Sequence, residues 1–396
     1  MSVFRNLSLE QLMDKLQELD RRRVDLVVPP SLLQMSASDL HINASDYVRH
    51  YATDQCIPDQ VTIRPNSVAH RQISDKLGIP KRYYDRMRAE HPNLLDDNVN
   101  GWLTKSEQPY LLRTYRDDDS DAGQPVATGR ALLSRRFKCI DNIHLLMSVL
   151  RAIQREKLAV VVETADITET KMYVRFVAPD VVVGANGLLK GYKNPKTLEV
   201  GDGVMAGFTL RNSEVGMGRY EIAPRAQVLV CKNGMIREKD VWGKNHLGTK
   251  LDEGAIDWSE DTYKHALNLI QSQVSDYVRH FASEEYLSKW LSEITELGNY
   301  QVKHPIACIE NVTRHFSVTE NDTESILDYF TLSNQNTAFG VAQAITYHAH
   351  QIGDPDKRND LESLADQVLV QVPKWDNRLP AGNTKIVASP QYGLGL

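Results

Sequence analysis

The chain has 396 residues, 41% of them hydrophobic and 25% charged, which is enough to bury two or three cores. Its formal net charge of −6 argues against a surface that binds polyanions over its whole area, and it leaves room for a local basic groove. No apolar run approaches the roughly 20 residues that cross a bilayer, and four widely spaced cysteines form no CxxC pair. We therefore expect a protein of a reducing cytoplasm without a membrane span, disulfide framework or zinc site.

Residues 1–107 are predicted to form a helical N-terminal region. Ser8 and Gln11 make a capping-box pattern ahead of apolar residues at helical spacing from Leu9 to Leu19. A short β-prone segment follows and is stopped by two prolines. Helical patterns return over residues 66–105.

Within this region, the segment from Arg71 to Arg88 contains two short helices around a Gly-Ile-Pro turn. Ile73, Leu77 and Ile79 fall near the buried positions of a helix-turn-helix, and the second helix is rich in Lys and Arg. The pattern is loose, so we favour a plain helical hairpin, with the DNA-binding motif as the alternative.

Residues 108–257 are predicted to form a β-rich core. Two strand patterns flank an acidic loop, and a helix capped by Asp141 precedes two further strands. From 208 to 236 the pattern indicates strand, Gly-rich turn and strand, and Asn233-Gly234 indicates a second hairpin turn. The fold class we expect is therefore α+β, with a central, mostly antiparallel sheet.

Residues 258–379 are predicted to form a helical C-terminal region, and 380–396 an irregular tail. The octet SDYVRHYA at Ser45 recurs with one change, as SDYVRHFA, at Ser275. Two unrelated amphipathic helix turns are the simpler explanation. Two equivalent helical surfaces for self-association are the alternative, which leaves a homo-oligomer open.

No segment carries a catalytic signature. Gly216-Met217-Gly218 lacks the spacing and the following helix of a dinucleotide-binding loop, and a tight hairpin explains it better. The acidic run from Asp117 to Asp121 does not match a calcium loop and is expected to be solvated. Glu169-Thr170-Lys171 has the Glu-x-Lys form of some nucleases, but its acidic companion, Asp180, follows it rather than precedes it. We expect no catalytic residue, metal or cofactor.

Basic residues cluster in the β-rich core, and we expect them to converge along one sheet surface. A basic groove with an interleaved aromatic side chain is what single-strand binding along the phosphate backbone requires. Scattered, solvated charge is the alternative. The candidate nucleic-acid-binding residues are Arg113, Arg116, Arg130, Arg135, Arg136, Lys138, Lys190, Tyr192, Lys193, Arg211 and Arg219.

Four stretches in order carry a family likeness: LGIPKRYYDRM, RALLSRRFKCIDNIHLL, NSEVGMGRYEIAPRAQVLVCKNGMI and NTAFGVAQAITYHAHQI. Over about residues 70–355 the chain resembles the phage/plasmid-like domain of unknown function 932 family of prophage, phage and plasmid proteins. The Ser-Glu-x-Gly turn with its trailing Cys-x-Asn-Gly is the most specific match. The resemblance implies an origin in a bacterial mobile element and implies no particular activity.

Three functions from different classes remain. The one we favour is nucleic-acid binding without catalysis, with single-stranded DNA as the preferred partner, in annealing, recombination or replication. The second is an interaction protein that antagonises a host defence or restriction factor. The third, a metal-dependent nuclease or hydrolase, rests on scattered acidic residues alone.

Overall fold

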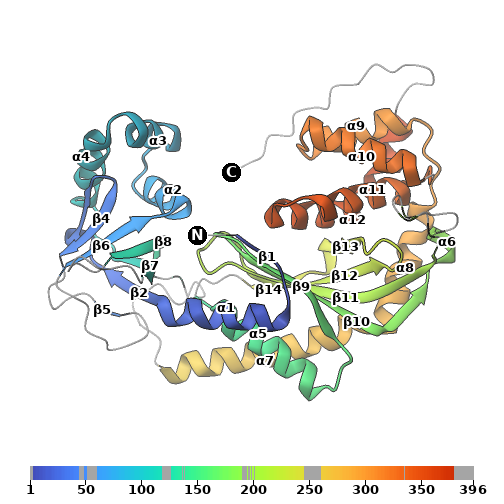
Figure 1. The fold of residues 1–396 in the computed structure, drawn as a ribbon, viewed down its shortest axis with the longest axis horizontal. Coiled ribbons are helices and arrows are strands. Elements are labelled where there is room, and N and C mark those ends of the chain that lie inside the picture. Colours follow the sequence, from blue (N-terminus) through green and yellow to red (C-terminus); the bar gives the residue numbers. More distant parts are fainter. Residues whose placement is uncertain are drawn as a thin grey trace.

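The computed structural model describes residues 3–43, 49–50, 60–117, 126–135, 137, 139–189, 194, 197, 199, 201–244, 260–333 and 335–378. These residues form two lobes, each built on its own sheet. Figure 1 shows the smaller, N-terminal lobe beside a larger lobe in which helices lie on both sides of a sheet. The first strand of the chain belongs to the larger lobe, so the chain starts there, enters the smaller lobe and returns.

Sheet A of the larger lobe is antiparallel throughout, with the order β1-β9-β10-β11-β12-β13 and with β14 paired to β12. Because side chains alternate along a strand, Tyr173 and Arg175 contact a helix on one face while Phe176 stacks on Phe208 on the other. The strands are β1 (Phe4–Leu7), β9 (Val161–Ile167), β10 (Met172–Gly184), β11 (Gly203–Asn212), β12 (Tyr220–Val228), β13 (Gly234–Ile236) and β14 (Trp242–Lys244).

Helices cover both faces of sheet A: α1, α5 and α7 lie on one side, and α11 and α12 on the other (Figure 1). The capping box at Ser8 forms with both of its hydrogen bonds, and α1 buries Leu12, Leu16 and Leu19. The helices of this lobe are α1 (Leu9–Arg22), α5 (Asn142–Arg155), α6 (Asn186–Leu189), η2 (Glu238–Asp240), α7 (Glu260–Phe281), α8 (Glu284–Gly298), α9 (Pro305–His315), α10 (Glu320–Ser333), α11 (Ala338–Gln351) and α12 (Pro355–Asp376).

Sheet B of the smaller lobe has the order β3-β4-β6-β8-β7-β2-β5, and β6 and β8 are its parallel pair. Three helices pack on it and share a core with Leu26, Ile63 and Leu112. Its elements are β2 (Arg23–Val28), η1 (Pro30–Leu32), β3 (Leu33–Ser36), β4 (Asp39–Asn43), β5 (Arg49–His50), β6 (Gln60–Pro65), α2 (Ser67–Lys76), α3 (Lys81–Glu90), α4 (Pro92–Leu103), β7 (Tyr110–Arg116) and β8 (Val126–Ser134).

The expected α+β class, with mostly antiparallel pairing and a helical C-terminal third, is confirmed. The structure adds two features. It has two sheets instead of one central sheet, and residues 1–107 contribute β1 to β6 beside their helices. Strands such as β3 and β4 hold only four or five residues. The alternating pattern of a strand this short gives a weaker signal than the helical periodicity of the segments around it, so the sequence predicted a helical region.

Where the structure describes them, the two copies of the repeated octet do not share a secondary structure. Its second copy lies in α7, whereas the described pair of its first copy, Arg49–His50, is strand β5 paired with β2. The acidic residues 118–121 and the tail 380–396 lie outside the described residues. Within the described ranges, no helix combines the length and the apolar character needed to cross a membrane.

The hairpin between β12 and β13 forms, but Asn233-Gly234 is not its turn. The left-handed residue is Lys232, with φ 55°. Asn233 is buried and donates from its side-chain amide to the Gln343 carbonyl of α11, over 3.3 Å. A Cβ on Gly234 would lie 2.1 Å from the Nε of Arg225. Packing against α11 and Arg225 therefore accounts for these two residues.

Candidate functional site

The Gly-rich turn between β11 and β12 joins the two lobes. Val215 at its tip is buried in a small core with Leu133 and Phe137, which come from the sheet B lobe. Gly216 has φ +73°, and a Cβ there would lie 2.7 Å from the Cδ2 of Leu133. The turn thus needs glycine both for its backbone conformation and for its close approach to the other lobe. It is a hairpin, as expected, and side chains of the smaller lobe fill the space around its tip.

Glu214, in the same turn, is the centre of a buried ion-pair network. Its carboxylate accepts from the Nη2 of Arg130 at 2.5 Å and from the backbone N–H of Asn142 at 2.6 Å. Its backbone carbonyl accepts from Arg113, which also donates to Asp25 and Asp141 at 2.6–3.1 Å. Burial favours the neutral acid, yet the guanidinium groups of Arg130 and Arg113 hold the pKa of Glu214 below its usual value.

This network corrects the prediction for Arg113 and Arg130. Arg113 is fully buried and Arg130 is 6% exposed, with its guanidinium also stacked 4.0 Å over the ring of Tyr115. Both pair with carboxylates that are distant in the sequence, Arg113 with Asp25 and Asp141, and Arg130 with Glu214. Because a buried, paired guanidinium cannot reach a phosphate, these two arginines hold the lobes together instead of binding nucleic acid.

The other candidate residues have different positions. Arg211 and Arg219 line a cleft between the lobes, and Arg135 directly follows the lining residue Ser134. Arg116 lies exposed at the end of β7. The described members therefore do not converge along one sheet surface, because two of them are buried between the sheets. Arg136, Lys138, Lys190, Tyr192 and Lys193 lie outside the described residues.

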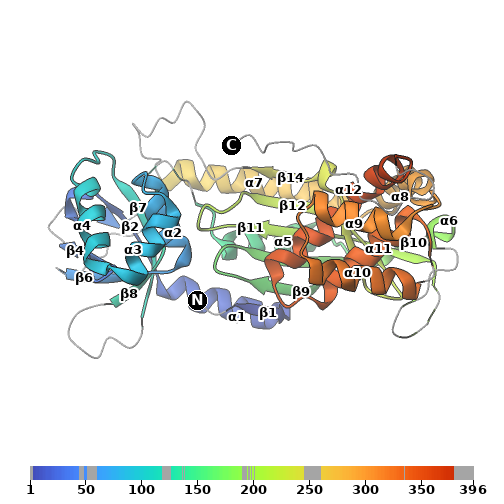
Figure 2. The same ribbon diagram turned by 90° about the horizontal axis from the view of Figure 1, so that it is seen from above.

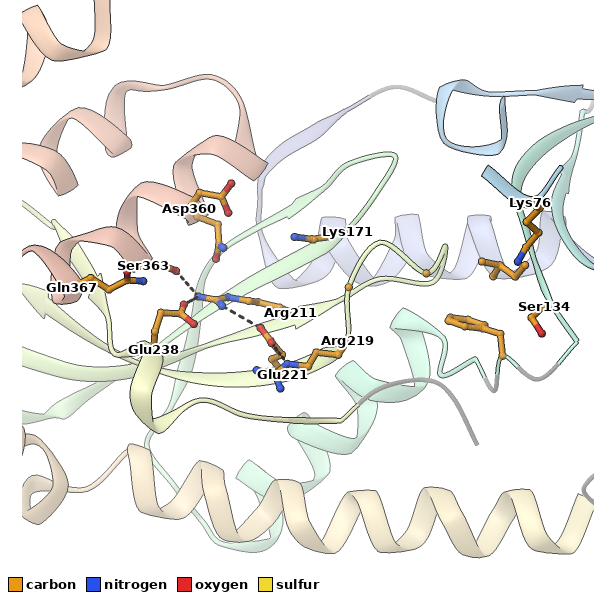
Figure 3. Close-up of a pocket in the computed structure, with 15 residues that line it drawn as sticks. Lys76, Ser134, Lys171, Arg211, Arg219, Glu221, Glu238, Asp360, Ser363 and Gln367 are labelled. Carbon is orange, nitrogen blue, oxygen red and sulfur yellow. Dashed lines mark hydrogen bonds and ion pairs between the residues drawn. The ribbon is translucent and has the colours of Figure 1, made fainter. Parts of the chain in front are cut away.

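The cleft has a volume of about 900 Å³ and is open to solvent. Figures 1 and 2 show α2 and α12 on opposite sides of the space between the lobes, and both contribute lining residues. The floor comes from sheet A and the Gly-rich turn (Figure 3). The lining residues are Lys76, Leu133, Ser134, Phe137, Lys171, Arg211, Gly216, Gly218, Arg219, Glu221, Glu238, Asn359, Asp360, Ser363 and Gln367.

Two of the basic side chains in the cleft are neutralised by acids on the same wall. Arg211 donates to Glu221 at 3.1 Å and to Glu238 at 2.8 Å, and Arg219 also pairs with Glu221 (Figure 3). Burial opposes the charge of Arg211, but these carboxylates raise its pKa above the usual value. Arg211 and Arg219 are therefore held in place and offer only part of their charge to a ligand.

Lys76 and Lys171 are different, because neither ammonium group has a carboxylate within ion-pair distance among the described residues. Lys76 ends α2, and partial desolvation lowers its pKa. Lys171 lies in the turn between β9 and β10. In Figure 3 it lies between α12 and Lys76. These two lysines supply the uncompensated positive charge of the cleft.

Gly218 makes room for one of these lysines. A Cβ at position 218 would lie 3.3 Å from the Cε of Lys171, so the lysine side chain runs across the backbone of the turn. The same turn therefore contacts the smaller lobe through Val215 and supports Lys171 in the cleft. The contact between the lobes and the position of the Lys171 ammonium group therefore both depend on the Gly-rich turn.

The opposite wall is the N-terminal half of α12, which presents hydrogen-bonding side chains. Ser363 accepts from Arg211 at 2.9 Å, and Asn359 is buried with its Oδ1 unpartnered. Burial raises the pKa of Asp360, and the nearby Lys171 opposes this rise. The side chains of this wall can donate hydrogen bonds to a ligand and accept hydrogen bonds from it, while the ligand's negative charge lies against the two lysines.

Sequence reasoning missed Lys76, Lys171 and the α12 wall. Lys76 resembles any basic residue at a helix end, and Lys171 was considered only within a Glu-x-Lys pattern. The α12 residues do carry a local signal, since Asn359, Ser363 and Gln367 recur at intervals of four and share a helix face. No local signal says that this face meets the end of α2 across the cleft.

Fold and site together define a two-lobed α+β protein with a polar cleft of mixed charge between its sheets. Among the described side chains, no group of three or more His, Cys, Asp and Glu residues is placed to hold a metal ion. Comparisons of the chain with family models, curated proteins and solved structures found no match. The likeness to the phage and plasmid family stays a prediction.

Proposed function

We propose that the cleft binds single-stranded nucleic acid without catalysis. The observation that carries this proposal is the pair of unpaired lysines, Lys76 and Lys171, which face a solvent-open cleft of about 900 Å³ from two different lobes. An ammonium group without a carboxylate partner keeps its full charge for phosphate, and phosphate contacts dominate the affinity of nucleic-acid binding. Arg211 and Arg219 border the same path.

The size of the cleft favours a single strand over a duplex. A volume of about 900 Å³ belongs to the range that holds small ligands, roughly 300–1,000 Å³. A few unpaired nucleotides fit such a space, whereas a double helix does not. The α12 wall then faces the bases, and the lysines face the backbone. Phe137, the aromatic side chain among the lining residues, is buried, so we expect charge to contribute more than base stacking.

The test is a salt titration of binding to a fluorescently labelled oligothymidylate. For wild type we expect affinity to fall steeply with salt. In Lys76→Ala/Lys171→Ala we expect weaker binding at low salt and a slope of log affinity against log salt that is shallower by about 1.4, since each contact to a single strand contributes about 0.7. Lys289→Ala, which removes an exposed lysine from α8, is the matched control and should bind as wild type does.

Two outcomes would exclude the proposal. One is the absence of binding by wild-type protein at low salt, and the other is an equal slope for the double variant and the Lys289→Ala control. A role in annealing or replication adds the expectation of self-association. Size-exclusion chromatography with light scattering, with and without the oligonucleotide, tests that part separately.

A further inference from the structure

A second candidate surface lies on the smaller lobe, on helix α3, which follows α2 and contributes no lining residue to the cleft. The connection between the two helices spans only residues 77–80. Gly78 has φ +66°, its N–H donates to the Asp75 carbonyl, and the N–H of Ile79 donates to the Ser74 carbonyl at 2.9 Å. These two bonds form a Schellman motif, which ends α2 sharply and sets the direction in which α3 begins.

The inward faces of the two helices are packed tightly against each other. Ser74 is fully buried, so its small side chain lets the helices approach, and Tyr84 and Met87 of α3 are also buried. The Nδ1 of His70 on α2 and the hydroxyl of Tyr84 share a hydrogen bond of 2.9 Å. Burial lowers the pKa of His70 to about 4, so this contact holds at neutral pH with an uncharged ring.

The outward face of α3 is basic. Arg82 and Arg86 are one helical turn apart and exposed, and the side chain of Arg86 is 72% exposed. Tyr83 between them is 45% exposed. Arg82 has no carboxylate partner among the described residues, and Arg86 pairs only with Glu90 of its own helix. Figure 1 shows α3 at the top of the smaller lobe, on the side that faces the C-terminal helices.

We propose that α2 and α3 form a helix-turn-helix that places α3 in the major groove of duplex DNA. A short turn with glycine, a buried inward face and a basic outward face are the features of this motif. A helix of about 10–12 Å diameter fits a major groove about 12 Å wide, and the N-terminal residues of the second helix reach the base edges. Arg82 and Arg86 occupy this face, and Arg71 of α2, which is exposed and pairs with Asp75 at 3.9 Å, would contact the phosphates.

This proposal takes up the alternative to the plain helical hairpin that the loose sequence pattern favoured. The decisive observations are the left-handed Gly78 and the burial of Ser74, Ile79 and Met87, because together they show that the exposed side chains of α3 are not needed for packing. The proposal uses residues that the cleft does not, since neither Arg82 nor Arg86 lines it.

The experiment measures binding to a labelled, random-sequence DNA duplex by anisotropy at low salt, with a salt titration. On random-sequence DNA the two arginines act mainly through their charge. We therefore expect weaker binding at low salt in Arg82→Ala/Arg86→Ala and a slope of log affinity against log salt that is shallower by about 1.8, since each contact to a B-DNA duplex contributes about 0.9. Arg279→Ala is the control, because Arg279 is an arginine of α7 whose side chain is 59% exposed and pairs with Asp276 of its own helix and with Glu156 of α5. Lys171→Ala reports on the cleft.

Both proposals stand if the α3 variant loses duplex binding and keeps oligothymidylate binding while Lys171→Ala does the reverse. The helix-turn-helix is overturned if wild-type protein binds no duplex at low salt. It is also overturned if the α3 variant binds duplex as the Arg279→Ala control does, or if only Lys171→Ala loses the duplex. Selection from a randomised duplex pool adds a second readout, since an enriched sequence must change or disappear in the α3 variant.

Discussion

At the scale of single residues, Glu214 shows how a turn residue can join two lobes. Its carboxylate pairs with Arg130. The partner belongs to the other sheet, and the carboxylate also accepts from the backbone of Asn142. A buried charge that satisfies groups from both lobes is costly to remove, because its partners stay buried without it.

We predict that Glu214→Gln lowers the free energy of unfolding by about 3–5 kcal/mol, the usual cost of leaving one partner of a buried ion pair unpaired. Urea denaturation followed by circular dichroism measures it. Glu296→Gln on α8 changes an exposed carboxylate and is expected to stay within about 0.5 kcal/mol of wild type. Equal effects of the two substitutions would show that the network adds nothing to stability.

At the scale of elements, three glycines with different surroundings separate backbone conformation from packing. Gly101 lies in α4 with open space around it and an ordinary φ. Gly78 has a left-handed φ and open space. Gly216 has a left-handed φ and a neighbour, Leu133, within 2.7 Å of the position that a Cβ would take. The turns that end α2 and join β11 to β12 thus depend on glycine for different reasons.

The alanine variants of these glycines are predicted to rank in that order. Gly101→Ala should stabilise the protein by about 0.5–1 kcal/mol, because alanine loses less conformational freedom in a helix. Gly78→Ala should cost about 1–2 kcal/mol through its left-handed backbone alone. Gly216→Ala should cost more than Gly78→Ala, since Leu133 must also move. Thermal unfolding checks the ranking, and a Gly216→Ala variant as stable as Gly78→Ala would contradict the packing argument.

At the scale of the whole molecule, the sheets and helices are connected through buried carboxylates. Glu362 of α12 is fully buried and contacts Arg175 of sheet A at 3.4 Å and Arg358 at 3.2 Å. Burial alone would raise its pKa, but these arginines and Arg225 lower it to about 2. Asp322, which links α10 to His348 and Lys357, likewise has its pKa lowered to about 2.

These shifts predict acid sensitivity. A carboxylate whose pKa is lower in the folded chain than in the unfolded chain stabilises the fold above its unfolded pKa, and this contribution disappears as the pH falls through the folded pKa. The free energy of unfolding should therefore be steady above about pH 5 and should fall between about pH 4.5 and pH 2. Urea midpoints measured over pH 2–7 test this. In Glu362→Gln the overall stability should be lower and the acid limb shallower, and an unchanged limb would contradict the assignment.

Much of the architecture was predictable from local pattern. The capping box at Ser8, the helix after Asp141 and the helical C-terminal third all follow from signals within a turn or two of chain. Pairing between distant segments was not predictable. The Asn233-Gly234 dipeptide indicated a turn. Asn233 instead contacts Gln343 and Gly234 makes room for Arg225, and neither of these partners belongs to the turn.

The candidate site shows the same division. Residue type and spacing were enough to establish an α+β chain with a Gly-rich hairpin and a basic second helix after Gly78. Whether a given arginine or lysine keeps its charge for a ligand was settled only by packing, because it depends on which carboxylates the fold brings within about 4 Å. Arg113 meets Asp25 and Asp141 from distant parts of the chain, whereas Lys76 and Lys171 meet none among the described residues. Electrostatic pairing falls off over a few ångströms of space and is indifferent to separation along the chain.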